Sequence, residues 1–460
     1  MLKFVMPTNM VLPSPCLTRL KKLWSTTLLY SLLIAFLAQS WLKLPTQTRS
    51  LLLWRYIATE PYSTPVLFVS CWLLPLIMMA TQNHMPSLAV TRQRTYMLLF
   101  TRMDAFLMLA FSATQLIMFH VMCEASLMPT LLIITRCGNE SVGLHAGTYL
   151  SFYTLARSLP VFIALLPVQN SWGTLYQLTL QLTMPSTITP YAEYLWWSRW
   201  LLAFLVNTRL YGPHLWLPKA LVEGPIAGSI MHAAVFVKLG GYGMMRIMPV
   251  LEPLTKELSL LFIILAHRGV VMTRSTSLRH TEHKSLMVYS TVRHLWLVAA
   301  ALLIQTPWSF TGALNLMIGH GLTSSALYCL ATTNYDPSHS RKLFLERRLQ
   351  MVVPIMTSWW FLASLANLAV ASLAQLMGDF MIVSFVLLWS PWTLSVTGSG
   401  SMITAGYSQL MLSMTQRGPL PAHIIRFNPT YTLEQLQIFP AMPPLWLLIL
   451  KPHLIWGWPS

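Results

Sequence analysis

Long apolar segments separated by short polar breaks make up almost the whole chain. Each segment is close to the roughly 20 residues that an α-helix needs to cross a membrane. Strands of a membrane barrel are about 10 residues long and alternate in polarity, whereas these segments are apolar all round. The pattern therefore predicts thirteen to fifteen transmembrane helices, near residues 23–42, 63–80, 96–112, 114–135, 144–167, 194–212, 226–249, 258–273, 285–305, 308–331, 350–370, 377–396, 399–413 and 432–450.

The polar connections leave no room for a soluble domain. Even the longest, residues 168–193 and 332–349, are too short to fold independently. We expect an all-α, polytopic transmembrane helix bundle that forms a single integral membrane domain over residues 1–460. Within it we separate N-terminal helices to about residue 112, a core over about 113–415, and a C-terminal segment over about 416–460.

Composition and charge support a membrane location and argue against a nucleic-acid partner. Hydrophobic residues make up 55% of the chain and charged residues only 9%, against about 25% charged in soluble domains. The net charge of +17 comes from short basic clusters between apolar segments, and such clusters fix the orientation of membrane helices. None is interleaved with aromatic residues as in a nucleic-acid groove. The clusters are Arg19, Lys21 and Lys22; Arg92 and Arg94; and Arg341, Lys342, Arg347 and Arg348.

No spacing in the sequence indicates a metal or a redox cofactor. The five cysteines form no C-x-x-C pair and no zinc or iron–sulfur pattern. His280 and His294 have a spacing along the sequence that haem-binding histidines can have, but no second helix offers matching histidines. The first apolar segment is too long for a secretory signal, and it has no transit-peptide character. A mitochondrial location would therefore imply synthesis inside the organelle.

Four ionisable residues lie inside or at the edge of predicted spans. Glu124, Lys238 and His320 are far from the span ends, and Asp379 opens a span. A charge at the bilayer centre is costly, so one that persists usually has a function. Buried lysines and carboxylates, like histidine, can change protonation near neutral pH. The pattern favours a proton relay; the alternatives are a structural ion pair, a hydrogen-bonded neutral histidine and, for Asp379, a solvated carboxylate.

The predicted span 194–212 ends in a segment that is rich in helix-breaking residues. Gly212, Pro213 and Pro218 follow one another closely at or near membrane depth. Transporters use discontinuous helices to build ion sites at the bilayer midplane. A turn at the membrane surface would have the same composition, and the pattern leaves both interpretations open.

Several long motifs closely resemble those of one family, the fourth membrane subunit (chain 4) of mitochondrial NADH–ubiquinone oxidoreductase, respiratory complex I. The resemblance runs from the N-terminus to near the end of the chain. The motifs lie at residues 210–220, 222–223, 225–229, 238–246, 305–313, 320–325, 359–360 and 362–369.

The resemblance implies an antiporter-like bundle of about fourteen helices with two inverted repeats and broken helices. It implies a translocase subunit that helps to pump protons across the mitochondrial inner membrane, driven by electron transfer from NADH to ubiquinone. FMN, iron–sulfur clusters and both redox substrates would bind other subunits, and this chain would bind no cofactor. Partners would be other complex I membrane subunits, including antiporter-like neighbours, and lipids such as cardiolipin.

The resemblance also assigns site residues. Glu124, Lys238 and His320 match the family's relay residues, and Lys284 and His294 match polar positions of the preceding helix. This chain departs from the family at two of the relay positions and at one helix break. Asn207 stands where the family has a lysine that pairs with the glutamate, so either Arg209 supplies the charge or no partner does. Asp379 replaces a glutamate, and Ala371-Ser372 replaces a nearby Pro-Pro.

Unusual charges in or near apolar segments need a partner or an interface. These are Arg102, Asp104, Arg157, Arg268 and Arg274.

Two further hypotheses compete with the leading one: a free-standing cation/proton antiporter, and a structural membrane subunit with an impaired channel, which Asn207 would favour. A haem-bearing subunit is the remaining alternative.

Overall fold

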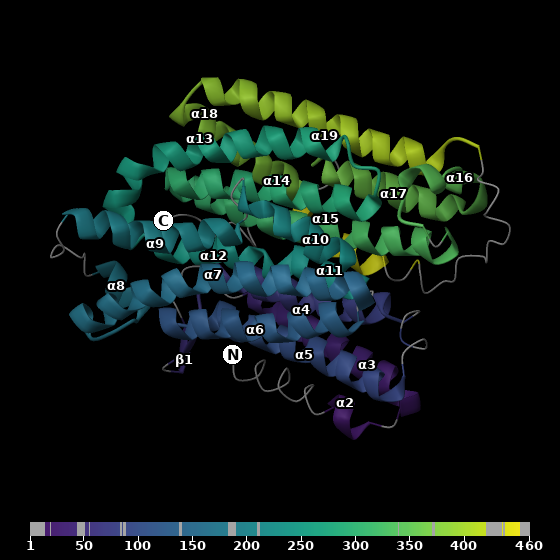
Figure 1. The fold of residues 1–460 in the computed structure, drawn as a ribbon, viewed down its shortest axis with the longest axis horizontal. Coiled ribbons are helices and arrows are strands. Elements are labelled where there is room, and N and C mark those ends of the chain that lie inside the picture. The colour runs from purple at the N-terminus through teal and green to yellow at the C-terminus, as the bar shows by residue number, and fades with distance from the viewer. Residues whose placement is uncertain are drawn as a thin grey trace.

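The computed structural model is a bundle of long helices that lie side by side along one axis (Figure 1). It describes residues 14–18, 20–43, 51–54, 56–82, 85, 89–137, 140–182, 190–208, 212–338, 340–369, 373–419, 435 and 438–450. The all-α prediction is confirmed. Within the described ranges, six helices are long and apolar enough to cross a membrane on their own.

The N-terminal helices pack as consecutive neighbours. Most are apolar throughout, because lipid replaces water as their surroundings. The elements are α2 (Ser14–Leu17), α3 (Leu20–Ala38), η1 (Gln39–Lys43), α4 (Ser63–Ala80), α5 (Val90–Ser112), α6 (Leu116–Cys137) and α7 (Glu140–Trp172). A short antiparallel hairpin, β1 (Leu51–Trp54) and β2 (Ile57–Thr59), lies against the turn between α5 and α6, and the apolar pattern did not predict it.

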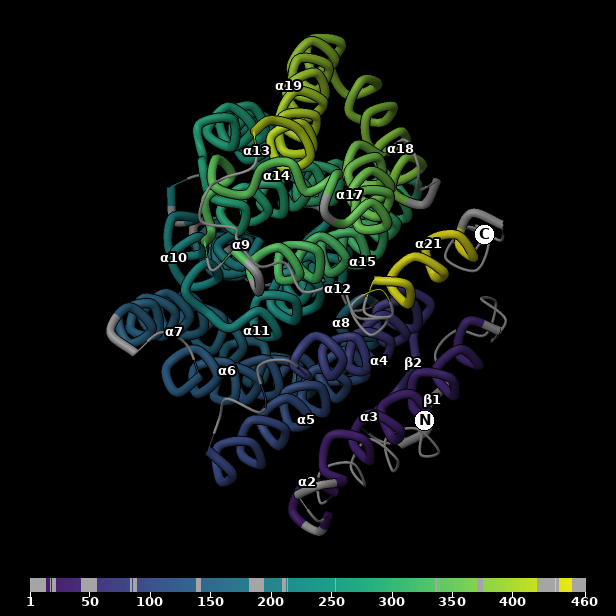
Figure 2. The backbone as a smooth tube through the Cα atoms, turned by 90° about the vertical axis from the view of Figure 1, so that its right-hand side faces the viewer, coloured from purple at the N-terminus to yellow at the C-terminus, as the bar shows by residue number. Residues whose placement is uncertain are grey.

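The middle of the chain contains the most enclosed helices. Its elements are α8 (Gln177–Leu182), α9 (Pro190–Asn207), η3 (Pro213–Leu215), α10 (Trp216–Glu223), α11 (Ile226–Met231), η4 (His232–Phe236), α12 (Lys238–Ile247), α13 (Glu252–Ser277), α14 (His283–Ile304) and α15 (Pro307–Ser338). Figure 2 shows α14 and α15 near the centre of the bundle, with α13 and α19 (Trp392–Gln416) on one side and α4 to α7 on the other. Almost every residue of α14 is buried.

The C-terminal part adds helices around this centre. Its elements are η5 (Leu343–Leu345), α16 (Leu349–Val352), α17 (Pro354–Asn367), α18 (Leu373–Trp389), α19 (Trp392–Gln416), η6 (Phe439–Ala441) and α21 (Met442–Leu450). The predicted boundary between 377–396 and 399–413 is wrong. The break lies at Ser390 and Pro391, and Gly398 and Gly400 lie inside α19.

Helix irregularities interrupt two of the predicted spans, and a third irregularity lies between two spans. The span 194–212 stops at Asn207, and helical structure resumes at Pro213; residues 209–211 are outside the described part. Just after this break His214 and Trp216 are buried, whereas Gly212 and Leu215 are exposed, so the segment lies at the edge of the bundle with one side turned inward. The span 226–249 contains a π turn, η4, and α17 and α18 meet end to end near Asn367 and Gln375.

Candidate functional site

A π turn sets the position of Lys238, the first residue of α12. η4 comprises five residues with i→i+5 hydrogen bonding, seen in the 3.2 Å bond from Val237 N to His232 O. π turns of this kind interrupt the regular α-helical ladder and recur at functional sites. The Lys238 side chain is 3% exposed, and its Nζ donates a hydrogen bond to Ala233 O at 2.7 Å. An ammonium group deep in the bundle thus has a backbone acceptor, which offsets part of its desolvation cost.

Two buried histidines lie beside this lysine. The ring of His320 on α15 is centred 4.1 Å from that of His294 on α14. Gly321 brings α15 close to η4, because a Cβ atom there would be 3.1 Å from Ala234 O and 3.8 Å from Lys238 Cε. Side chains from α12, α15 and α14 therefore meet in one buried polar cluster.

α18 extends the cluster with Gln375, a residue that the sequence analysis missed. Its Nε2 lies 3.3 Å from His294 Nε2, and its Oε1 accepts a hydrogen bond from Thr323 at 3.3 Å. Asp379 follows one turn later on the same helix, and it forms no ion pair within the described part of the chain. A polar amide four residues before a predicted site acid was the signal that could have identified Gln375.

Two buried arginines flank these groups. Arg293, which the sequence analysis did not single out, directly contacts the ring of its neighbour His294. Arg274 on α13 is buried against Gly400 of α19 and donates to Thr397 O at 3.4 Å. The charge of Arg274 is therefore met by a backbone carbonyl between helices and by the longer-range attraction of Asp379.

Glu124 has a basic partner, and that partner is Arg157. Arg157 Nη2 on α7 lies 3.3 Å from Glu124 Oε1 on α6, and its Nη1 donates to Asn207 Oδ1 at 2.5 Å. The Arg157 side chain is 10% exposed and that of Glu124 is 27% exposed. One guanidinium group thus joins the acid to the asparagine. Arg209, expected as one possible source of this charge, lies outside the described residues.

A pocket of about 430 Å³ surrounds this ion pair. Its polar lining consists of His120, Glu124, Arg157, Ser158 and Asn207, and the rest is mostly apolar. It reaches the helix of Lys238, because Leu239 forms part of its wall. Asn207 also packs against α12, since a Cβ atom on Gly240 would be 3.0 Å from the Asn207 Cβ.

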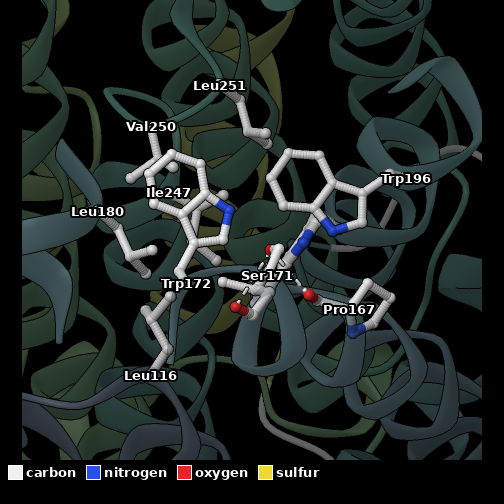
Figure 3. A pocket seen from close by; sticks show the side chains of 11 residues that line it. Leu116, Pro167, Ser171, Trp172, Leu180, Trp196, Ile247, Val250 and Leu251 are labelled. Atoms are coloured by element: carbon white, nitrogen blue, oxygen red, sulfur yellow. Dashed lines mark hydrogen bonds between the residues drawn. The ribbon is translucent and has the colours of Figure 1, made fainter. Parts of the chain in front are cut away.

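A neighbouring pocket of about 510 Å³ is almost entirely apolar (Figure 3). Trp172 and Trp196 line it together with aliphatic side chains such as Leu180 and Leu251. Leu116 and Trp200 belong to both pockets. With no ionisable group in its lining, this second pocket offers no chemistry for proton transfer.

Lys284 lies apart from the histidines, at the beginning of α14. Its Nζ donates to Gly224 O at 3.1 Å and to Val222 O at 3.4 Å, at the C-terminal end of α10. Arg341 pairs with Glu223 at 3.4 Å at the same helix end. Cations are favoured there by the unsatisfied carbonyl groups and the helix dipole. Ten residues of α-helix, about 15 Å, separate Lys284 from His294.

The remaining unusual charges lie on helices outside this cluster. Arg102 and Arg268 are exposed on the outer faces of α5 and α13. Asp104 is buried on α5, and its Oδ1 has no hydrogen-bond partner among the described residues.

Comparison with known proteins places the chain among respiratory membrane subunits. Residues 1–110 match the family model "NADH-ubiquinone oxidoreductase chain 4, amino terminus". Residues 113–404 match the model "NADH:quinone oxidoreductase/Mrp antiporter, TM". NADH-ubiquinone oxidoreductase chain 4 of Tetraodon nigroviridis is 58% identical over 459 residues, and that of Gadus morhua is 54% identical over 458 residues; both matches cover 100% of each chain.

Solved structures show the same fold at low sequence identity. A chain of respiratory complex I from Thermus thermophilus superposes with a TM-score of 0.88 at 19% identity, covering 99% of this chain and 96% of that chain. A chain of the archaeal membrane-bound sulfane sulfur reductase gives a TM-score of 0.86 at 15% identity, with the same coverage. Both likenesses show a shared bundle architecture.

Proposed function

The chain belongs to the NADH–ubiquinone oxidoreductase chain 4 family, and we propose that it is a proton-translocating membrane subunit of respiratory complex I. In this proposal it lies in the mitochondrial inner membrane beside other complex I membrane subunits, with lipids such as cardiolipin around it. Proton translocation is driven by electron transfer from NADH to ubiquinone, through FMN and iron–sulfur clusters that other subunits hold. The chain itself holds no redox cofactor.

The observation that carries the proposal is the position of Lys238. Lys238 lies between the pocket of Glu124 and the pair His294 and His320. On one side, its neighbour Leu239 lines the pocket. On the other side, its Cε comes close to Gly321, which follows His320. A buried amine in this position can receive a proton from one side and release it to the other. We propose that protons pass from Glu124 through Lys238 to His320 and His294, and from there toward Asp379.

Electrostatic coupling between buried groups would order these steps. Two unit charges about 10 Å apart interact by about 1.7 kcal/mol at an effective dielectric constant of 20. That energy is more than a tenfold change in a protonation equilibrium. Neutralising Glu124 therefore changes the affinity of Lys238 for its proton, and a change at Lys238 acts in turn on His320.

Gln375 would serve this path without carrying a proton itself. An amide does not titrate, but it can hold a neighbouring ring by hydrogen bonds. Its contacts with His294 and Thr323 fix both partners relative to α18. Asp379 is on the same helix, four residues further on, which places an acid at the far end of the polar cluster.

A structural subunit with an impaired channel remains the second candidate, because Asn207 cannot exchange protons. The contact between Arg157 and Glu124 weakens this candidate, since the glutamate keeps a cationic partner. A free-standing antiporter would have to work outside a larger assembly. Native electrophoresis of inner mitochondrial membranes with mass spectrometry tests this point: the chain should occur only in a large band with NADH dehydrogenase activity, and migration alone would favour the antiporter.

The relay is tested by Lys238→Ala in the whole complex, purified and reconstituted in proteoliposomes. We expect proton pumping to be lost while the complex still assembles. Lys256→Ala is the control, because Lys256 is exposed on α13 and its one ion pair among the described residues is with Glu252. A normal proton-to-electron ratio in the Lys238→Ala complex would refute the relay.

A further inference from the structure

The pocket at Glu124 contains a second group that can exchange protons, and the proposed relay does not use it. His120 is four residues before Glu124 on α6, so both side chains project from the same face of the helix. Both also line the same pocket of about 430 Å³. The two groups are therefore neighbours across a shared space rather than along the sequence alone.

The chemistry of the other lining side chains leaves this role to His120. An arginine stays protonated under all physiological conditions, so Arg157 contributes a fixed charge. Asn207 and Ser158 have no proton to exchange near neutral pH. Cys123 also lines the pocket, but a thiol has an ordinary pKa of about 8.5 and is mostly protonated at neutral pH. Histidine is the side chain whose ordinary titration lies in that range. Glu124 and His120 are thus the proton-exchanging pair among the polar groups that line the pocket.

The contacts of His120 hold its ring and leave its nitrogens available. The ring stacks on Phe162 of α7, with centroids 6.5 Å apart and planes 26° apart. Within the described part of the chain, its nitrogens form no hydrogen bond with another protein group. Much of the pocket is open to the surroundings, and the space for water centres inside it is about 30 Å³. One water needs roughly 10–15 Å³ of such space, so the pocket has room for about two waters near His120 and Glu124.

We propose that His120 is a further proton-transfer residue of this pocket, and that it loads Glu124. This inference rests on the proposed function. The neutral ring accepts a proton at one nitrogen from a hydronium ion that reaches the pocket, which leaves a water molecule, and the ring becomes an imidazolium. Arg157 repels this second positive charge, and the proton passes to a carboxylate oxygen of Glu124, directly or through pocket water. The ring is then neutral again, and the uncharged carboxyl group holds the proton.

The test compares complexes that carry His120→Phe, His145→Phe or Glu124→Gln, each reconstituted in proteoliposomes. Phenylalanine keeps the stacking on Phe162 but cannot carry a proton. Positioned acid–base groups contribute about 100-fold or more to proton-transfer rates, so we expect pumping by His120→Phe to fall at least about tenfold. His145 is exposed near the start of α7 and serves as the matched control, with wild-type pumping expected.

A second variant separates proton transfer from a merely structural role. His120→Ala leaves space for a small base, and added imidazole should restore pumping to this complex without raising that of Glu124→Gln. Failure of imidazole to restore pumping would overturn the assignment. Normal pumping in His120→Phe alongside impaired pumping in Glu124→Gln would also overturn it while leaving the relay intact. Normal pumping in both would refute the relay itself.

Discussion

Replacing Glu124 and Arg157 by glutamine, singly and together, should show that the two side chains act as one unit. Unit charges 3.3 Å apart attract by about 5 kcal/mol at an effective dielectric constant of 20. Desolvation and the partial exposure of Glu124 oppose this attraction. We therefore expect a coupling energy of about 1–3 kcal/mol, the upper part of the range for contacting residues.

The assay is a double-mutant cycle on thermal inactivation of the assembled complex, with proton pumping measured in parallel. Arg157→Gln should be strongly destabilising, because it leaves a largely buried carboxylate without its partner. Adding Glu124→Gln should then cost little more. Lys256 and Glu252 provide a control cycle, since both are about half exposed or more and such pairs are worth less than about 1 kcal/mol. Additive effects of the two substitutions at Glu124 and Arg157 would refute the reasoning.

Three further predictions concern packing, a loop and pH. Gly378→Ala should destabilise the complex by about 1–3 kcal/mol, because its Cβ atom would be 2.7 Å from a backbone nitrogen of α15. Gly406→Ala is the control and should not destabilise the complex, since a Cβ atom there meets open space. Rates of thermal inactivation compare the two variants. His283→Ala removes the 2.9 Å contact with buried Glu346, so limited proteolysis should cut the loop at 341–348 faster. Burial lowers the pKa of His280, so the unfolded chain binds a proton there more readily than the folded one. The stability of the complex should therefore decline as the pH falls below about 6.5. His280→Phe should reduce this decline, as measured by thermal inactivation at several pH values.

The helices of this fold were largely predictable because a segment that crosses lipid must be apolar, helical and about 20 residues long. The predicted segment 63–80 coincides with α4, and 285–305 differs from α14 only at its ends. The rule fails where a glycine serves helix packing instead of chain breaking. The predicted spans 377–396 and 399–413 leave a gap at Thr397 and Gly398, yet both residues lie inside α19. Gly400 of the same helix lacks a side chain and so admits the buried Arg274.

The site was predictable where a single residue carries the signal. Lys238 and His320 stand out because an isolated ionisable group in an apolar segment is costly. The bridge through Arg157 was not predictable, since Asn207 is fifty residues further along the chain and only the packing of α7 against α9 brings the two together. Gln375 was missed for another reason: an uncharged amide in a span carries a small cost and gives a weak signal.

The π turn before Lys238 makes this region sensitive to the number of residues as well as to their identity. A helix advances about 100° per residue, and the π turn accommodates one residue more than a regular α-helix would. Deleting any one residue within His232–Phe236 would remove the residue that the π turn absorbs and let the regular α-helical spiral close. The wide turn from which Lys238 Nζ reaches Ala233 O would then be lost. In this stretch of chain, an in-frame loss of one codon is a more severe change than most substitutions.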